Sequence, residues 1–437
     1  MAKVMNTTEI NSALVNFANT YAGLCNRIEL PEPTYENRAS HALSIGRNVT
    51  DDTPAVLIIG GVHAREWGGP DIVVNFAGDI LRAYQAGKGL KYGKKSFSAD
   101  EIRQIVNTVN VVVFPCVNPD GVEFSHTKNH MWRKNRNPAS AKPKKPDTVG
   151  VDINRNYDFL WEFRKYFAPA AAQDDSIASD DPAAETFHGI KPFSEPETRN
   201  VRWLMEKFPK LALFMDVHSF SGDVLYTWGI DQNQISDPSM NFNNPAYNDK
   251  RGIINDLYRE YLSPADYTII TDLAQTMADA MKAVRGQPYK PLQSVGLYPT
   301  AGASDDYCYS RHLLDPKRPK TFSYTIEFNF GSGNDGFLQT GNPKVLDATI
   351  RDVIPGLIAL CLSVPKATTH AMAASLAATP AVAGAAGASY RTALGSGVAQ
   401  LLAAYESVVA VRGEAGDAAR KGLLKAIQTA AREAGAD

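Results

Sequence analysis

The sequence predicts an α/β domain with a mixed, largely buried sheet flanked by helices, followed by an alanine-rich helical hairpin. Short apolar and β-branched runs alternate with longer segments of helical spacing, which is typical of an α/β fold. The runs are apolar throughout, which indicates strands that are buried on both faces. After residue 364 the chain becomes rich in alanine and again shows helical spacing.

Each element of the main domain has a local signal in the sequence. Strands are expected at Ala55–Ile59, Val109–Phe114, Leu211–Val217 and Thr321–Phe328. Helices are expected at Thr8–Leu24, Pro70–Tyr84, Asp100–Asn107, Pro196–Phe208, Pro264–Val284 and Pro343–Leu362. The run Asn-Pro-Asp-Gly at Asn118–Gly121 predicts a turn after the second of these strands.

These elements divide the chain into four segments. Residues 1–50 form an N-terminal lead-in and 51–364 the main domain, followed by an alanine-rich linker at 365–388 and a helical hairpin at 389–437. The glycines of Gly413–Gly416 separate the two helices of the hairpin. We expect the hairpin to pack on the main domain or to mediate self-association with a second copy. A specific recognition role for the tail is the alternative.

Composition excludes several classes of function. The formal net charge of the 437 residues is -2, which favours neither nucleic acid nor an anionic membrane as a partner. No run reaches the roughly 18 apolar residues of a membrane span. The first residues lack a secretory pattern, so a cytoplasmic location is expected unless a signal was removed. The four cysteines are scattered, which suggests core residues and not thiolate zinc ligands.

A candidate metal site stands at the ends of two predicted strands. His63 and Glu66 follow the first strand, and His218 closes another. A catalytic zinc ion takes three protein ligands of this kind and keeps one position open for water. Each signal alone is weak, because single histidines and His-x-x-Glu pairs occur often by chance. Asp152 is the candidate carboxylate for the second nitrogen of a metal-binding histidine.

Seven motifs in one order carry a resemblance to a known family. They are His63–Glu66, Asn118–Gly121, Trp132–Arg136, Val151–Asn156, His218–Ser219, Tyr298–Gly302 and Thr325–Phe328. Together they resemble the zinc metallocarboxypeptidases similar to pancreatic carboxypeptidases A and B, from about residue 55 to 337. The resemblance implies a carboxypeptidase-like fold with a mostly parallel central sheet. It also implies one zinc ion per chain, bound by the two histidines and the glutamate named above.

The resemblance assigns roles in hydrolysis of the C-terminal peptide bond by a zinc-activated water. It implies that Glu327 is the general base and that Arg133 stabilises the oxyanion. The residues implied to bind the substrate's terminal carboxylate and neighbouring peptide are Asn154, Arg155, Tyr298 and Arg65. The expected partners are therefore the C-termini of peptides or proteins.

The same resemblance bears on which C-terminal residue is removed. Asp305 stands seven positions after Tyr298, where the family places a specificity residue, and aspartate there favours C-terminal lysine or arginine. Leu225 and Gly229 are implied to line the same pocket. The alternative is that Asp305 faces water or caps a turn while Asp306 is buried.

Other functions stay open at this point. A zinc amidase or deacylase for small N-acyl amino acids or cell-wall peptides could use the same metal site, although the implied carboxylate-binding residues argue against it. A non-catalytic binding protein on the same fold, and an assembly module based on the tail, are further alternatives. The segment 229–298 is longer than in the pancreatic enzymes, and its Asn-rich middle, 241–249, could form a rim or lid.

Overall fold

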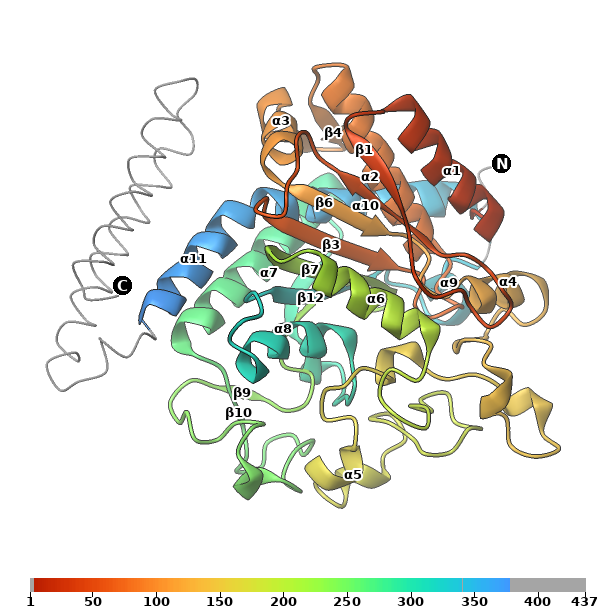
Figure 1. Cartoon of the computed structure of the whole chain (residues 1–437), viewed down its shortest axis with the longest axis vertical. Helices are drawn as coiled ribbons and strands as arrows, with labels where there is room; N and C mark the ends of the chain where they lie inside the picture. The colour runs from red at the N-terminus through yellow and green to blue at the C-terminus, as the bar shows by residue number, and fades with distance from the viewer. Residues whose placement is uncertain (1–3, 340, 378–437) are drawn as a thin grey trace, which may run out of the picture. The chain divides into compact units, whose positions relative to one another are not determined.

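The central feature of the fold is one eight-stranded sheet. The computed structural model describes residues 4–339 and 341–377. The strand order is β1-β2-β6-β3-β7-β12-β8-β11 (Figure 1). The strands of this sheet are β1 (Cys25–Glu29), β2 (His41–Ile45), β3 (Ala55–Gly60), β6 (Asn110–Phe114), β7 (Leu211–Ser219), β8 (Asp223–Tyr226), β11 (Lys290–Gln293) and β12 (Phe322–Phe328). Two small sheets pair β4 (Leu90–Tyr92) with β5 (Lys95–Phe97), and β9 (Asn233–Gln234) with β10 (Glu260–Tyr261).

The centre of the large sheet is parallel and its flanks are mixed. Neighbouring strands are parallel from β6 through β3 and β7 to β12, and again between β8 and β11. The pairs β1–β2, β2–β6 and β12–β8 are antiparallel. Every residue of β3, β6, β7 and β12 is buried, as expected for apolar strands covered on both faces. The prediction of a mixed, mostly parallel sheet flanked by helices is confirmed.

Helices cover both faces of this sheet. In the part of the chain before residue 364 they are α1 (Thr7–Thr20), α2 (Gly68–Gln85), α3 (Ala99–Thr108), α4 (Pro119–Thr127), α5 (Phe163–Tyr166), α6 (Pro196–Lys207), α7 (Pro264–Arg285), α8 (Ser304–Leu314), α9 (Gly333–Gly336) and α10 (Pro343–Leu362). Helices α2, α7 and α10 pack together on one face, whereas α8 contacts β7 and β12 from the other (Figure 1). Helices α1 and α3 begin with capping boxes, and α6, α7 and α10 begin with proline, which suits the first turn of a helix.

Most of the expected elements are present, with ends shifted by a few residues. The turn predicted at Asn118–Gly121 is wrong, because Asn118 caps α4 by accepting a hydrogen bond from the Gly121 N–H. A proline after such a cap begins a helix as readily as it makes a turn. Four strands of the large sheet, β1, β2, β8 and β11, were not predicted. Each has only four or five residues, too few for a period to show.

The structure describes only the first part of the region that follows the main domain. Helix α11 (Val364–Ala377) occupies the first part of the segment expected to be a linker, 365–388. The rest of that segment and the predicted hairpin at 389–437 lie outside the described residues. All four cysteines are buried and unpaired, as expected. Among the described helices, none is both long and apolar enough to cross a membrane.

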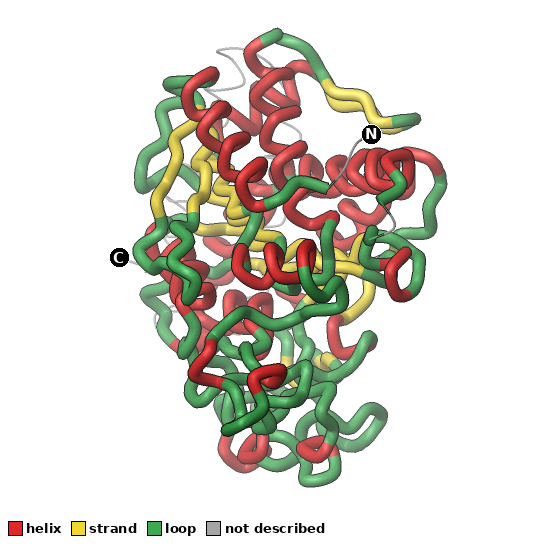
Figure 2. The backbone as a smooth tube through the Cα atoms, turned by 90° about the vertical axis from the view of Figure 1, so that its right-hand side faces the viewer, coloured by secondary structure: helices red, strands yellow, loops and turns green. Residues whose placement is uncertain are grey.

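Long loops gather at one end of the main domain. Residues 128–195 and 229–262 contain few regular elements, and α5, β9 and β10 mark their position at the lower end of Figure 1. Figure 2 shows the same end as mostly loop. These loops include both the Asn-rich segment and three of the residues that the sequence assigned to substrate binding, Asn154, Arg155 and Gly229.

Candidate active site

The predicted metal ligands meet at the carboxyl ends of adjacent parallel strands. His63 and Glu66 lie on the turn that follows β3, and His218 is the penultimate residue of β7. Reactive groups collect at this edge of a parallel sheet because the following loops leave it free. All three side chains are buried.

The three side chains present their donor atoms to one point. His63 Nδ1 lies 2.8 Å from Glu66 Oε1, and His218 Nδ1 lies 3.0 Å from Glu66 Oε2. The two Nδ1 atoms are themselves 3.0 Å apart. At this separation the two nitrogens either share a proton or bind one cation, and the carboxylate beside them balances the positive charge. A donor set of two imidazole nitrogens and one carboxylate is the set that zinc prefers, so the residues fit a zinc ion.

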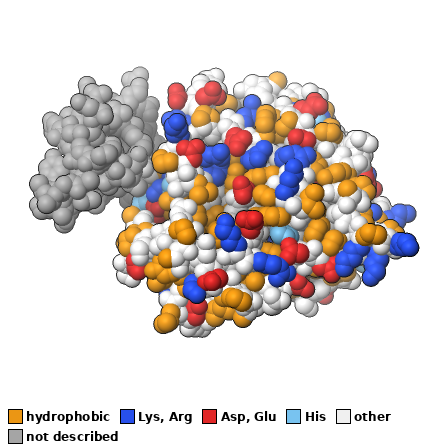
Figure 3. All heavy atoms as spheres, turned by 60° about the horizontal axis from the view of Figure 1, so that its bottom comes forward, with side chains coloured by type: hydrophobic (Ala, Val, Ile, Leu, Met, Phe, Trp, Pro, Cys, Tyr) orange, Lys and Arg blue, Asp and Glu red, His pale blue; other side chains and the backbone are white. Residues whose placement is uncertain are grey.

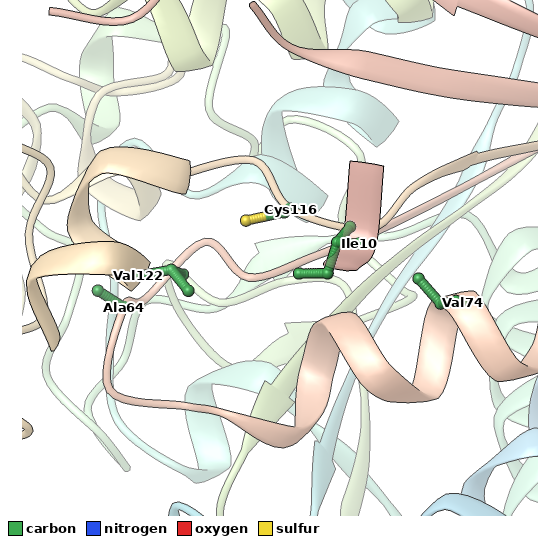
Figure 4. Close-up of a cluster of buried hydrophobic side chains, with 5 residues drawn as sticks. All are labelled: Ile10, Ala64, Val74, Cys116 and Val122. Carbon is green, nitrogen blue, oxygen red and sulfur yellow. The ribbon is translucent and has the colours of Figure 1, made fainter. Parts of the chain in front are cut away.

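The turn that carries two of the ligands is fixed by packing. Gly61 has a φ of 65°, and an added Cβ there would come within 3.3 Å of the Pro115 carbonyl oxygen. Ala64, between the two ligands, is fully buried. It belongs to a cluster of hydrophobic side chains from three helices and a loop, shown in Figure 4: Ile10, Ala64, Val74, Cys116 and Val122. The cluster therefore anchors the turn from the side opposite the ligands.

Electrostatics hold the ligands in charge states that depend on one another. Burial alone would raise the pKa of Glu66, but the His63 and His218 imidazoles outweigh it and lower the pKa below its ordinary range. Burial alone would lower the pKa of His218, but the carboxylates of Asp216 and Glu66 raise it well above its ordinary range. A metal ion that binds His218 must therefore displace a proton.

Asp152 and Arg133 lie directly behind His63. Asp152 Oδ1 is 3.2 Å from His63 Nε2, the nitrogen that points away from the metal site. Arg133 donates to the other oxygen of Asp152 through Nε at 3.0 Å and Nη2 at 2.8 Å. Burial opposes ionisation of Asp152, but Arg133 and His63 outweigh it and hold its pKa well below the ordinary range. The guanidinium predicted to stabilise an oxyanion is thus held beside the metal ligands.

Glu327 lies next to the metal ligands on the neighbouring strand. It stands in register with His218, because β12 pairs with β7 in parallel. Burial and the negative charge of Glu66 raise the pKa of Glu327. A carboxyl group in such surroundings accepts and releases a proton more readily near neutral pH than an exposed one.

The residues predicted to bind a terminal carboxylate come from two loops that meet at the start of α8. Asn154 Oδ1 accepts a hydrogen bond of 2.8 Å from the Ser304 N–H. The Arg155 guanidinium lies 5.9 Å from the centre of the Tyr298 ring. Arg155 is also buried, and it donates to the carbonyls of Asn154 and Ser176. These contacts fix the orientation of its guanidinium.

The predicted pocket residues lie near two neighbouring buried carboxylates, because Gly229 donates its backbone N–H to Asp306 Oδ2 at 2.9 Å. Asp305 Oδ2 lies 3.3 Å from the hydroxyls of Ser294 and Thr325. Thr325 pairs with Leu225 across the sheet, and a Cβ added to Gly229 would lie 3.4 Å from Ser294 Cβ. Asp305 and Asp306 are both buried, so Asp305 does not face water, but its Oδ1 accepts a hydrogen bond of 2.9 Å from the Asp306 N–H in the first turn of α8.

Arg65 projects from the metal-binding turn toward a neighbouring loop. It forms an ion pair of 2.8 Å with Glu185, and its guanidinium lies 5.0 Å from the centre of the Phe337 ring. Glu185 was not singled out from the sequence. Nothing in the chain around it distinguishes it from other loop carboxylates.

Asp216 is a second residue that the sequence analysis missed. Its Oδ1 lies 3.0 Å from His218 Nε2, on the same strand. A signal existed, since side chains two positions apart on a strand point to the same face. The search for a carboxylate partner considered only the motif around Asp152.

Comparison with known proteins identifies the class. A profile of the zinc carboxypeptidases, peptidase family M14, matches residues 10–352. Carboxypeptidase B of Astacus astacus is 30% identical over 336 residues, which is 76% of this chain and 88% of that protein. Carboxypeptidase A2 of Rattus norvegicus is 27% identical over 303 residues, 69% of this chain and 58% of that one, so the chain spans little more than half of this relative. The chain belongs to the zinc carboxypeptidase family, and its zinc ligands are His63, Glu66 and His218.

Solved structures agree on the fold. The crystal structure of thrombin-activatable fibrinolysis inhibitor superposes with a TM-score of 0.62 at 22% identity, covering 83% of this chain and 75% of that one. Carboxypeptidase A from Helicoverpa armigera gives a TM-score of 0.59 at 21% identity, covering 85% of this chain and 75% of that one. These likenesses concern the fold, whereas the enzyme class, a zinc metallocarboxypeptidase, rests on the family profile, the Astacus astacus relative and the metal site.

Proposed function

We propose that this enzyme removes C-terminal lysine or arginine from peptides. The observation that carries the proposal is the environment of Asp305. Its carboxylate is buried, and its hydrogen-bond donors are the hydroxyls of Ser294 and Thr325 and the backbone N–H of Asp306. Among the described residues no lysine or arginine forms an ion pair with it. A buried carboxylate without a cation is costly, and a basic substrate side chain would supply one.

The surface supports a pocket-based preference. Figure 3 shows charged side chains of both signs interspersed with apolar ones over most of one face. The formal net charge of the whole chain is only -2. A broad negative field is therefore not what would attract basic substrates, and discrimination would arise inside the pocket.

We assign the remaining groups by their position around the zinc site. Glu327 would accept a proton from the attacking water and deliver it to the leaving amine nitrogen. Arg133 would balance the negative charge that develops on the carbonyl oxygen. Asn154 and Arg155 would bind the free C-terminal carboxylate, with Tyr298 beside them. A guanidinium pairs with a carboxylate through two parallel hydrogen bonds, so it suits an enzyme that recognises a chain end.

Zinc, when bound by its three ligands, supplies a Lewis acid and lowers the pKa of water to about 7. The protein groups add to this by excluding water and by holding the proton acceptor in place. Glu327 is fixed by its strand, and Arg133 by its two bonds to Asp152. Little reorganisation is then needed as the charge develops.

The test compares the wild-type enzyme with Asp305→Asn on two peptides that differ only in their last residue, arginine or phenylalanine. We expect the wild type to release arginine with the higher kcat/KM. Asp305→Asn should lower kcat/KM for arginine by at least about 30-fold, since one member of a buried charge pair is lost. Release of phenylalanine should not fall.

Two controls separate the outcomes. Asp352→Asn removes a buried carboxylate that pairs with Arg285 in another part of the domain, and should change neither rate. Amidated peptides should not be cleaved by either enzyme. Preferential release of phenylalanine by the wild type would contradict the pocket assignment and leave the enzyme class intact. Cleavage of amidated peptides as fast as free ones would contradict recognition of the chain end.

A further inference from the structure

Asp216 and His218 form an isolated buried pair on β7. Asp216 Oδ1 lies 3.0 Å from His218 Nε2, and both side chains are almost completely buried. The contact is an ion pair by distance, and neither atom has a hydrogen-bond partner among the described residues. Buried polar atoms without partners are rare and costly. Among residues 4–339 and 341–377, each of these two atoms therefore has the other as its ion-pair partner.

The other oxygen of Asp216 is held in place. Asp216 Oδ2 accepts a hydrogen bond of 2.7 Å from the hydroxyl of Ser304, the first residue of α8. The backbone N–H of Ser304 donates to Asn154 Oδ1 at 2.8 Å. Ser304 therefore connects the carboxylate behind His218 with a loop on the proposed substrate side. It also limits rotation of the Asp216 side chain.

The zinc site gives this pair a chemical role. His218 turns Nδ1 toward the shared donor point, so Nε2 must carry the proton when the metal is bound. His63 meets the same requirement through Asp152. Metal-bound histidines are oriented and made more basic by a carboxylate on the far nitrogen. We propose that Asp216 is a positioning residue that orients His218 for zinc, so that each zinc histidine has its own carboxylate.

The two carboxylates differ in what else they contact. Asp152 shares its charge with Arg133 through two hydrogen bonds. No lysine or arginine forms an ion pair with Asp216 among the described residues, where its contacts are Ser304 and His218. Among the described residues, His218 is therefore the ion-pair partner of Asp216. Removal of the Asp216 charge should weaken metal binding without leaving a guanidinium unpaired.

The experiment measures zinc binding directly, so it does not depend on which peptide the enzyme cleaves. The purified full chain is stripped of metal, and the zinc dissociation constant is measured by competition with a chromophoric chelator. Asp216→Asn preserves the shape of the side chain and removes its charge. We expect zinc affinity to fall by about 10–100-fold. The visible absorption spectrum of the cobalt-substituted protein should change, because the orientation of one ligand has changed.

Two further variants make the result interpretable. Asp352→Asn removes a buried carboxylate that lies outside the zinc site, and should retain wild-type affinity and spectrum. Ser304→Ala keeps the Asp216 charge but frees its orientation, and should weaken zinc by a smaller factor. Wild-type affinity and cobalt spectrum in Asp216→Asn would overturn the proposal, whatever its peptidase activity. If that variant does not fold, wild-type zinc affinity in Ser304→Ala would overturn it.

Discussion

His218 and Glu327 stand in register on adjacent parallel strands, β7 and β12. One is a zinc ligand, and the other is the carboxyl group that we propose as the proton acceptor. Continuous backbone pairing between β7 and β12 fixes the positions of both residues. The distance between the zinc ligand and the Glu327 carboxyl group therefore does not depend on the conformation of a loop. A shift of one residue in this register would turn Glu327 to the other face of the sheet.

Replacement of Glu327 by glutamine should abolish most activity without loss of zinc. The amide keeps the shape of the side chain but cannot accept and return a proton, so we expect kcat to fall by about 100–10,000-fold. Steady-state kinetics and the zinc content of the purified protein check this together. Glu197→Gln, a change at another buried glutamate far along the chain, is the matched control and should retain kcat. Equal losses in both variants would mean that Glu327 acts through folding.

Enlarging Ala64 should weaken zinc binding from behind the turn. Ala64 is fully buried in the cluster of Figure 4, and overpacking at such a site costs about 1–3 kcal/mol and shifts the backbone. We expect Ala64→Leu to lower zinc affinity, whereas Val74→Ala, in the same cluster but on α2, should lower stability alone. Chelator competition and urea unfolding measure the two effects. A leucine at 64 with unchanged zinc affinity would show that the cluster does not position the turn.

Glu197 should make stability fall as pH rises. Burial and the negative charge of Glu195 raise the pKa of Glu197 to about 8, and one of its oxygens has no hydrogen-bond partner. Between pH about 4.5 and about 8 the folded chain keeps a proton that the unfolded chain releases, so the free energy of unfolding declines across that window. Glu197→Gln removes this pH dependence. By pH 8 its free energy of unfolding should exceed that of the wild type by on the order of a few kcal/mol.

Urea unfolding at pH 5 and pH 8 tests whether the free energy of unfolding falls as the pH rises. Glu29→Gln, at an exposed position on β1, controls for the loss of one negative charge. The prediction fails if wild type and Glu197→Gln keep the same difference in unfolding free energy at both values.

The Arg251–Glu260 pair should hold the Asn-rich segment against the pocket. Both side chains are fully buried, 3.3 Å apart, and Arg251 also donates to the carbonyls of Asn241 and Tyr247. Arg251→Met leaves Glu260 without its cation, and should cost about 3–5 kcal/mol of stability. The double variant with Glu260→Gln should recover part of this loss.

The same segment contacts the proposed pocket through Trp228, which precedes Gly229. The centre of the Trp228 ring lies 5.4 Å from that of Phe242, which belongs to this segment, and the Trp228 ring also stacks on Phe159. Arg251→Met should therefore also raise KM for a peptide ending in arginine. An unchanged KM in a folded variant would show that the segment does not support the pocket.

The sequence predicted the zinc site well because each ligand had two independent signals. His63 and His218 follow or close apolar strands, and their motifs occur in the order of a known family. The short strands β8 and β11 carry no period long enough to detect, yet they complete the sheet beside Glu327. Asp216 was overlooked although its spacing from His218 was visible. The burial of both Asp305 and Asp306 could not be predicted from the sequence, because it depends on which loops pack over these positions.

The outer strands of the large sheet bear on how copies of the chain meet. The order of strands leaves β1 and β11 as its two edges. Pro291 lies within β11 and has no N–H to offer another strand, while β1 exposes Asn26, Arg27 and Glu29. Neither edge therefore favours hydrogen bonding to a strand of another molecule, so edge-to-edge extension of the sheet is disfavoured.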